Sequence, residues 1–110
     1  MIISKTNNIT VLTQERASIP ELVLKINDSY GQIKNDNIVL NLTSLKKLSV
    51  NDIVEFLQIS NTHRSGKHSF VIVNNTIDVD ETPEEIIVVP TLQEAFDIIE
   101  MEEMERDLGL

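Results

Sequence analysis

The residues best suited to chemistry lie in a short segment at positions 43–49, together with Asn51. It combines the hydroxyls of Ser44 and Ser49 with the ammonium groups of Lys46 and Lys47, and it follows an apolar run and precedes a helical pattern. Such groups beside a helix N-terminus could hold an anion or the carboxylate of a partner, because free backbone N–H groups and the positive end of the helix dipole point there. An ordinary strand–helix connection, in which Ser49 serves only as the helix cap, explains the same residues.

Two elements must position this segment. Residues 38–42 form a β-rich apolar run, which is typical of a strand covered on both faces. Ser49 and Asp52 have the spacing of a capping box, in which each side chain accepts a hydrogen bond from the other residue's backbone N–H. We therefore expect a helix from residue 50 to about residue 65, packed on the strand through Ile53, Val54 and Leu57.

The rest of the chain supplies the other elements of an α/β domain. Apolar runs predict strands near residues 1–5, 8–13, 69–74 and 85–89, and residues 75–85 are acidic and without a helical stripe. Capping boxes at 18–21 and 91–94 predict the starts of two further helices. The order is ββαβαββα, which favours one small mixed β-sheet with helices packed against it in a single domain spanning 1–110.

The central segment resembles the STAS domain, the family of the anti-sigma factor antagonists. That family has an apolar strand ending in D-L-S, a short loop, and D-S-S-G-L-G opening a helix; here Asn41-Leu42-Thr43 and residues 49–54 take these places. SFVIVN, IIVVP and TLQEAFDIIE match the later strands and the closing helix. The resemblance covers most of the chain as a pattern of elements. It places Asn51 at the position of the phosphorylated serine and Asp52 at that of the following glycine.

The resemblance implies a regulatory protein–protein interaction module that works without serine phosphorylation, because Asn51 carries no hydroxyl and Asp52 already supplies a fixed negative charge. Phosphorylation of Ser44 or Ser49 instead stays open. The alternatives are a module that binds a nucleotide or another small anion, and a non-catalytic partner subunit of a neighbouring enzyme such as ribonuclease Z. The candidate partner-binding residues are Ser44, Lys46, Lys47, Ser49, Asn51, Asp52, Glu55 and Gln58.

Composition argues against an enzyme. There is no cysteine, which excludes thiol catalysis, and neither a G-x-S-x-G nor a P-loop motif occurs. His63 and His68 have no carboxylate near them in the sequence, so we expect both to be exposed near a helix C-terminus and expect neither a metal site nor a cofactor. The first residues lack a long apolar stretch, which together with the Ile- and Asn-rich usage predicts a cytoplasmic, bacterial protein.

Charge is unevenly distributed along the chain. Residues 78–110 hold twelve acidic side chains and one basic one, whereas residues 1–77 carry a small positive excess. Phosphates would be repelled by the acidic part, so we expect neither nucleic acid nor a membrane surface as its partner.

Residues 101–110 extend the last helix, and Met101, Met104 and Leu108 leave a narrow apolar stripe on it. Such a stripe either caps the edge of the domain or docks in a basic-rimmed groove of a partner protein.

Overall fold

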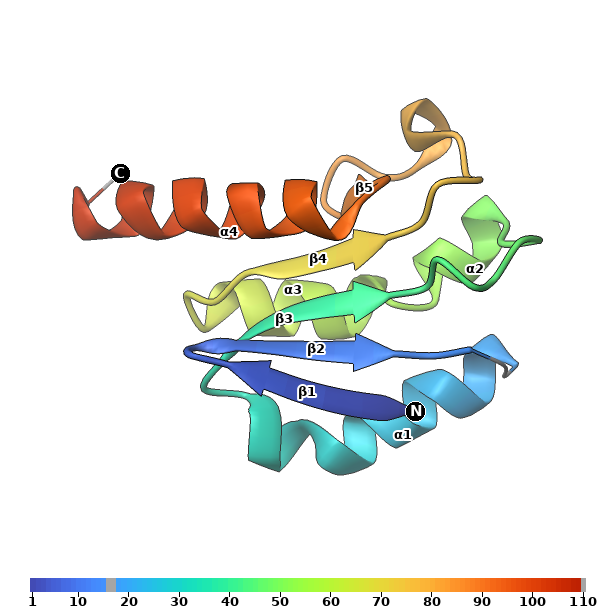
Figure 1. Ribbon diagram of the computed structural model, residues 1–110, viewed down its shortest axis with the longest axis horizontal. Coiled ribbons are helices and arrows are strands. Elements are labelled where there is room, and N and C mark those ends of the chain that lie inside the picture. The colour runs from blue at the N-terminus through green and yellow to red at the C-terminus, as the bar shows by residue number, and fades with distance from the viewer. Residues whose placement is uncertain (16–17, 110) are drawn as a thin grey trace.

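A computed structural model describes residues 1–15 and 18–109 of the chain. The elements follow in the order β1 (Ile2–Thr6), β2 (Ile9–Thr13), α1 (Ile19–Ile33), β3 (Asn37–Asn41), α2 (Val50–Val54), α3 (Leu57–Ser65), β4 (Phe70–Val73), the 3-10 helix η1 (Val79–Glu81), β5 (Ile87–Val89) and α4 (Leu92–Asp107), as Figure 1 shows. The predicted α/β class with a mixed sheet is confirmed.

The five strands form one sheet in the order β1-β2-β3-β4-β5. β1 and β2 are an antiparallel hairpin whose turn contains Asn7 at a φ of 53°, a left-handed conformation that asparagine tolerates. β2 to β5 run parallel to one another, so each connection must cross back over the sheet. The carboxyl ends of these four strands therefore meet at one edge.

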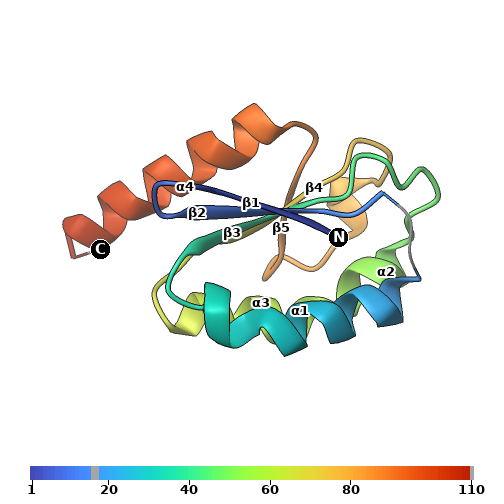
Figure 2. The ribbon, with the colours of Figure 1, turned by 60° about the horizontal axis from the view of Figure 1, so that its bottom comes forward.

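Helices cover both faces of the sheet, with α1, α2 and α3 on one side and α4 on the other (Figure 2). Successive residues of β3 point to opposite faces, so Ile38 and Leu40 join the larger core cluster while Val39 joins the smaller one beneath α4. All three side chains are fully buried. This confirms the prediction of an interior strand covered on both faces.

The helix predicted over residues 50–65 is in fact two helices, α2 and α3. At the break, the N–H groups of Glu55 and Phe56 bond to the carbonyls of Asp52 and Ile53, three residues back, at 3.3 and 3.0 Å. These tighter turns bring Phe56, which is fully buried, into the core. Val54 is 42% exposed, so its predicted place in the core is wrong. It lies one residue beyond the buried Ile53, about 100° further around the helix.

The three predicted helix starts are confirmed. The hydroxyls of Ser18, Ser49 and Thr91 accept hydrogen bonds from the backbone N–H groups of Glu21, Asp52 and Glu94. The segment expected to be a loop at residues 75–85 contains η1, whose N-terminus is capped by the side chain of Asp78. In α1, α2 and α4 a capping side chain therefore defines where the helix begins.

Candidate functional site

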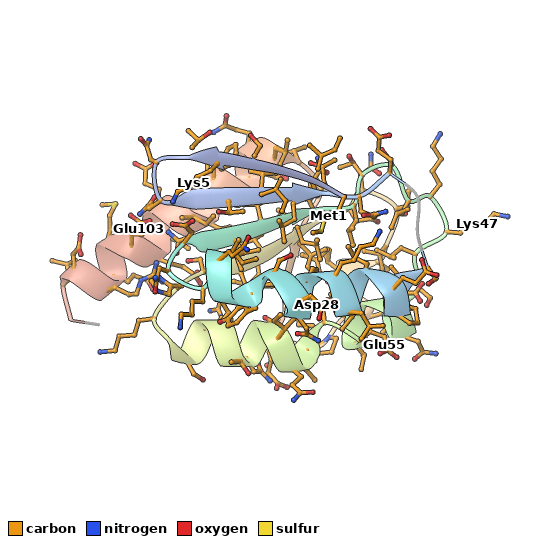
Figure 3. The ribbon with its side chains drawn as sticks, turned by 90° about the horizontal axis from the view of Figure 1, so that it is seen from below. Met1, Lys5, Asp28, Lys47, Glu55 and Glu103 are labelled. Atoms are coloured by element: carbon orange, nitrogen blue, oxygen red, sulfur yellow. The ribbon has the colours of Figure 1, made fainter. Side chains whose placement is uncertain are left out.

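The loop between β3 and α2 lies at the edge where the carboxyl ends of the parallel strands meet (Figure 1). It sits beside the segment that links β4 to β5. Figure 3 shows Lys47 extending away from the helices at this end of the molecule, while Lys5 and Glu103 lie at the opposite end. The predicted site is therefore at the carboxyl edge of the sheet, as such folds commonly place it.

Two asparagines fix the backbone of this edge. The side-chain oxygen of Asn41 accepts from the N–H and the hydroxyl of Thr43, at 3.2 and 2.9 Å. Asn74 is buried at the end of β4, and its Nδ2 donates to the carbonyls of Leu42 and Leu45, both at 2.9 Å. Its Oδ1 accepts from the N–H and the hydroxyl of Thr76. The loops after β3 and β4 are thus tied to each other.

The capping box at the start of α2 is complete. The hydroxyl of Ser49 accepts from the N–H of Asp52 at 3.1 Å, and the Asp52 carboxylate accepts from the N–H of Ser49 at 3.0 Å. The Ser49 hydroxyl is consequently occupied, and a carboxylate already neutralises the helix end. Since α2 has only five residues, its dipole is small and attracts an anion only weakly.

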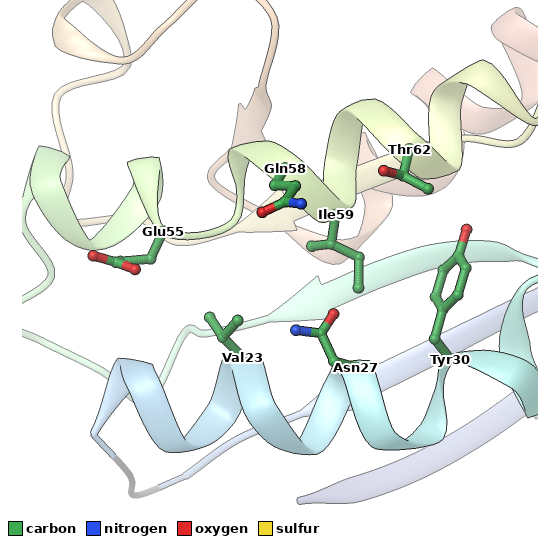
Figure 4. A pocket seen from close by; sticks show the side chains of 7 residues that line it. All are labelled: Val23, Asn27, Tyr30, Glu55, Gln58, Ile59 and Thr62. Carbon is green, nitrogen blue, oxygen red and sulfur yellow. The ribbon is translucent and has the colours of Figure 1, made fainter.

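Six of the eight candidate residues line one of two pockets, and Ser49 and Asn51 line neither. A shallow pocket of about 320 Å³ at the carboxyl edge is lined by Ser44, Lys46, Lys47 and Asp52, together with the apolar side chains of Ile19, Leu45 and Leu48. Glu55 and Gln58 lie instead in a groove of about 330 Å³ between α1 and α3, whose walls also carry Val23, Asn27, Tyr30, Ile59 and Thr62 (Figure 4). Asn51 is exposed on α2 and lines neither pocket.

A buried polar cluster surrounds His63, which was expected to be exposed. This side chain is fully buried, so the expectation that it would be exposed at the helix end is wrong. Its Nε2 lies 2.7 Å from the carbonyl oxygen of Asp36, and its Nδ1 lies 2.8 Å from the hydroxyl of Tyr30. A neutral ring that donates from Nε2 and accepts at Nδ1 satisfies both contacts.

Burial disfavours the charged forms of the His63 ring and the Tyr30 hydroxyl. Desolvation lowers the pKa of His63, and the nearby His68 ring lowers it further, although the carbonyl and the carboxylate of Asp36 oppose the change. Burial also raises the pKa of Tyr30. The Asp36 carboxylate accepts from the hydroxyl of Thr10 at 2.9 Å and pairs with Lys5 at 3.2 Å. A helical period running from Phe56 through Ile59 to His63 is the signal that could have predicted the inward ring.

A second polar cluster ties α4 to the amino edge of the sheet. Glu102 binds Arg64 at 3.0 Å and the Ser69 hydroxyl at 2.7 Å. Glu103 accepts from the side-chain amides of Asn8 and Asn37. Arg106 donates to the hydroxyl of Ser69 and the side-chain oxygen of Asn37, both at 3.3 Å. This face of the predicted helix extension is therefore a structural cap.

The described parts of the chain contain neither a candidate metal site nor a candidate membrane span. Within residues 1–15 and 18–109, no three His, Asp or Glu side chains come together as a possible metal site. None of the helices described there is long and apolar enough to cross a membrane. Comparisons with known proteins add no identity, because no family model and no curated protein matches the chain.

Proposed function

We propose that this chain is a non-catalytic regulatory module that binds another protein, in the manner of the anti-sigma factor antagonists whose STAS domain its sequence resembles. The binding surface is the loop at 44–49 with the exposed side of α2. The observation that carries the proposal is the exposure of Ser44, Lys46, Lys47 and Asn51 on a backbone that Asn41 and Asn74 hold from beneath. A surface prepared in this way loses little conformational entropy on binding.

The proposed module works in the cytoplasm without a phosphorylation switch, a cofactor or a metal. Asn51 has no hydroxyl, and the hydroxyl of Ser49 is bound to the N–H of Asp52, whose carboxylate would repel a phosphate. Incubation with serine kinases of the anti-sigma type and ATP should leave the intact mass unchanged. A phosphate mapped to Ser44 or Ser49 would contradict this part of the proposal.

The test of the surface is a pair of double charge reversals. Lys46→Glu/Lys47→Glu changes the proposed surface, whereas Lys25→Glu/Lys34→Glu makes the same change in net charge at exposed positions of α1 and its C-terminal end. Affinity capture from the native host should recover a protein with the parent chain and with the α1 control. The loop variant should no longer capture this protein, because attraction between the two lysines and opposite charges on the partner is replaced by repulsion.

The proposal fails if both variants retain the same proteins as the parent. Urea unfolding of all three proteins belongs to the experiment, since loss of capture counts only when the loop variant is as stable as the control. All four lysines are exposed, so we expect changes in stability within about 0.5 kcal/mol.

A small anionic ligand is the second candidate, favoured by the pocket that Lys46 and Lys47 line. A nucleotide bound there would contact their ammonium groups. It would raise the melting temperature, and the rise would increase with the nucleotide concentration. Adding ATP or GTP should then shift the melting temperature of the parent and of the α1 control, and leave that of the loop variant unchanged. The absence of any shift in the parent excludes both nucleotides.

A further inference from the structure

The helix α4 has two unlike faces. On the inner one, Ala95 and Ile99 are buried in the smaller core cluster, and the side chains of Glu102, Glu103 and Arg106 bind the amino edge of the sheet. On the outer one, Met101, Met104 and Leu108 are 50%, 59% and 73% exposed. Their spacing of three and four residues aligns them along one side of the helix for about two turns.

The contacts of the inner face fix the direction in which the outer face points. Glu102 bridges to α3 through Arg64, and Glu103 reaches both the β1–β2 turn at Asn8 and the start of β3 at Asn37. In Figure 1 the end of α4 projects beyond this edge of the sheet. The three apolar side chains are therefore presented on a helix that is already folded and oriented, so a partner would not need to order it.

The charge around this stripe determines what can cover it. The helix carries seven acidic side chains and one basic side chain, Arg106, which turns inward. Five of the acidic side chains are exposed: Glu94, Asp97, Glu100, Glu105 and Asp107. A second copy of α4, a nucleic acid or an anionic lipid surface would bring like charges together. A cationic protein surface would neutralise them.

We propose that the outer face of α4 is a second docking surface, separate from the loop at 44–49, and that it binds a cationic amphipathic helix of a partner protein. Apolar side chains of that helix pack against Met101, Met104 and Leu108. Helices in contact lie about 8–10 Å apart, so lysines and arginines flanking the apolar side of the partner reach the exposed carboxylates of α4. Methionines suit such a contact because their flexible side chains adapt to irregular surfaces.

The probe is a short peptide of leucine and lysine arranged with the helical period, and its control has glutamate in place of lysine. The test variant of the full chain is Met101→Ser/Met104→Ser/Leu108→Ser. The matched control variant is Ile2→Ser/Leu24→Ser/Val79→Ser, which removes three exposed apolar side chains elsewhere and keeps the charge. Fluorescence anisotropy measures the affinity, and chemical-shift perturbation of the parent chain maps the contact.

The lysine peptide should bind the parent and the control variant with similar affinity, perturb resonances between residues 94 and 108, and bind the α4 variant about tenfold more weakly, because three apolar contacts are lost. Raising the salt concentration should weaken binding, since it screens exposed charges. Equal binding to the α4 variant, perturbations confined to other elements, or equal binding of the glutamate peptide would overturn the proposal. A dimer of the parent chain that the α4 variant abolishes would overturn it too, by making a second copy the occupant.

Discussion

The buried ring of His63 joins three parts of the chain through two hydrogen bonds. It lies on α3, accepts from Tyr30 of α1 and donates to the carbonyl of Asp36, which directly precedes β3. Protonating Nδ1 would remove the acceptor that the Tyr30 hydroxyl uses and would place a charge among apolar neighbours such as Phe70. The ring is therefore a point at which pH acts on the stability of the fold.

We expect the free energy of unfolding to fall as the pH drops below about 6.5, the usual pKa of histidine. Burial lowers the pKa of His63 in the folded chain, so the unfolded chain takes up the proton first and becomes favoured on acidification. Urea unfolding at several pH values between neutrality and mild acid measures this slope. The variant His63→Gln should have a smaller slope. His68→Gln should keep most of the slope, because burial, the larger cause of the lowered pKa of His63, remains when the neighbouring ring is removed. Equal slopes in the parent and His63→Gln would exclude His63 as the cause.

The side chain of Ser60 is expected to lower the stability of the fold. Its hydroxyl is fully buried and has no hydrogen-bond partner in the described parts of the chain. Ser60→Ala should raise the free energy of unfolding by about 1 kcal/mol, because an unsatisfied buried hydroxyl is removed. Ser29→Ala in α1 is the control, since it makes the same change in helix propensity at a half-buried position. A gain no larger than that of the control would mean that burial of the Ser60 hydroxyl carries no penalty.

Among the elements, the break between α2 and α3 separates two side chains of one apolar pattern in the sequence. Phe56, which lies at the break, is fully buried, whereas Val54 at the end of α2 is 42% exposed. A pattern of this kind gives the period of a helix but not the place where the helix is interrupted. A partner would therefore contact the exposed side of a five-residue helix, and not that of one continuous helix over residues 50–65.

Aspartate substitutions at neighbouring positions test this arrangement. Ile53→Asp should lower the free energy of unfolding by several kcal/mol, about 3 or more, because an unpaired carboxylate would enter the core. Val54→Asp should change it by less than about 1 kcal/mol, since that side chain is 42% exposed. Urea denaturation compares the two. The opposite ranking would mean that Val54, and not Ile53, faces the core.

In the whole molecule, regular patterns were predictable and long-range polar contacts were not. The interior strand and the three capped helix starts follow from residues close together in the sequence, such as Ser49 and Asp52. The capping box, the two lysines and their position at the carboxyl edge could also be predicted. The separation of Glu55 and Gln58 from that pocket was not predictable, because it depends on how the helices pack against one another. The partners of the buried His63, Tyr30 and Asp36, lie 33 and 27 positions away in the chain, so local sequence does not encode them either.

The end of α4 contributes to the stability of the whole fold. Removing residues 101–110 should lower the free energy of unfolding by about 1–3 kcal/mol, because the amide of Asn37 and the hydroxyl of Ser69 lose the partners described above. The shortened chain should still fold, since Ala95 and Ile99 remain in the core. Calorimetry and urea unfolding measure the loss. No change would show that the polar cluster at the amino edge stabilises nothing, and an unfolded product would show that the fold requires it.

The bond between Asn8 and Glu103 joins residues 95 positions apart in the chain. Each strand of the sheet pairs with the strand that follows it, so the sheet can grow in the order in which a ribosome releases its parts. The first hairpin, however, gains its contact with α4 only after almost all of these residues have been synthesised. Until then the amino edge of the sheet remains open to water and to other chains, and a nascent chain stalled before Glu102 would expose it for as long as the stall lasts.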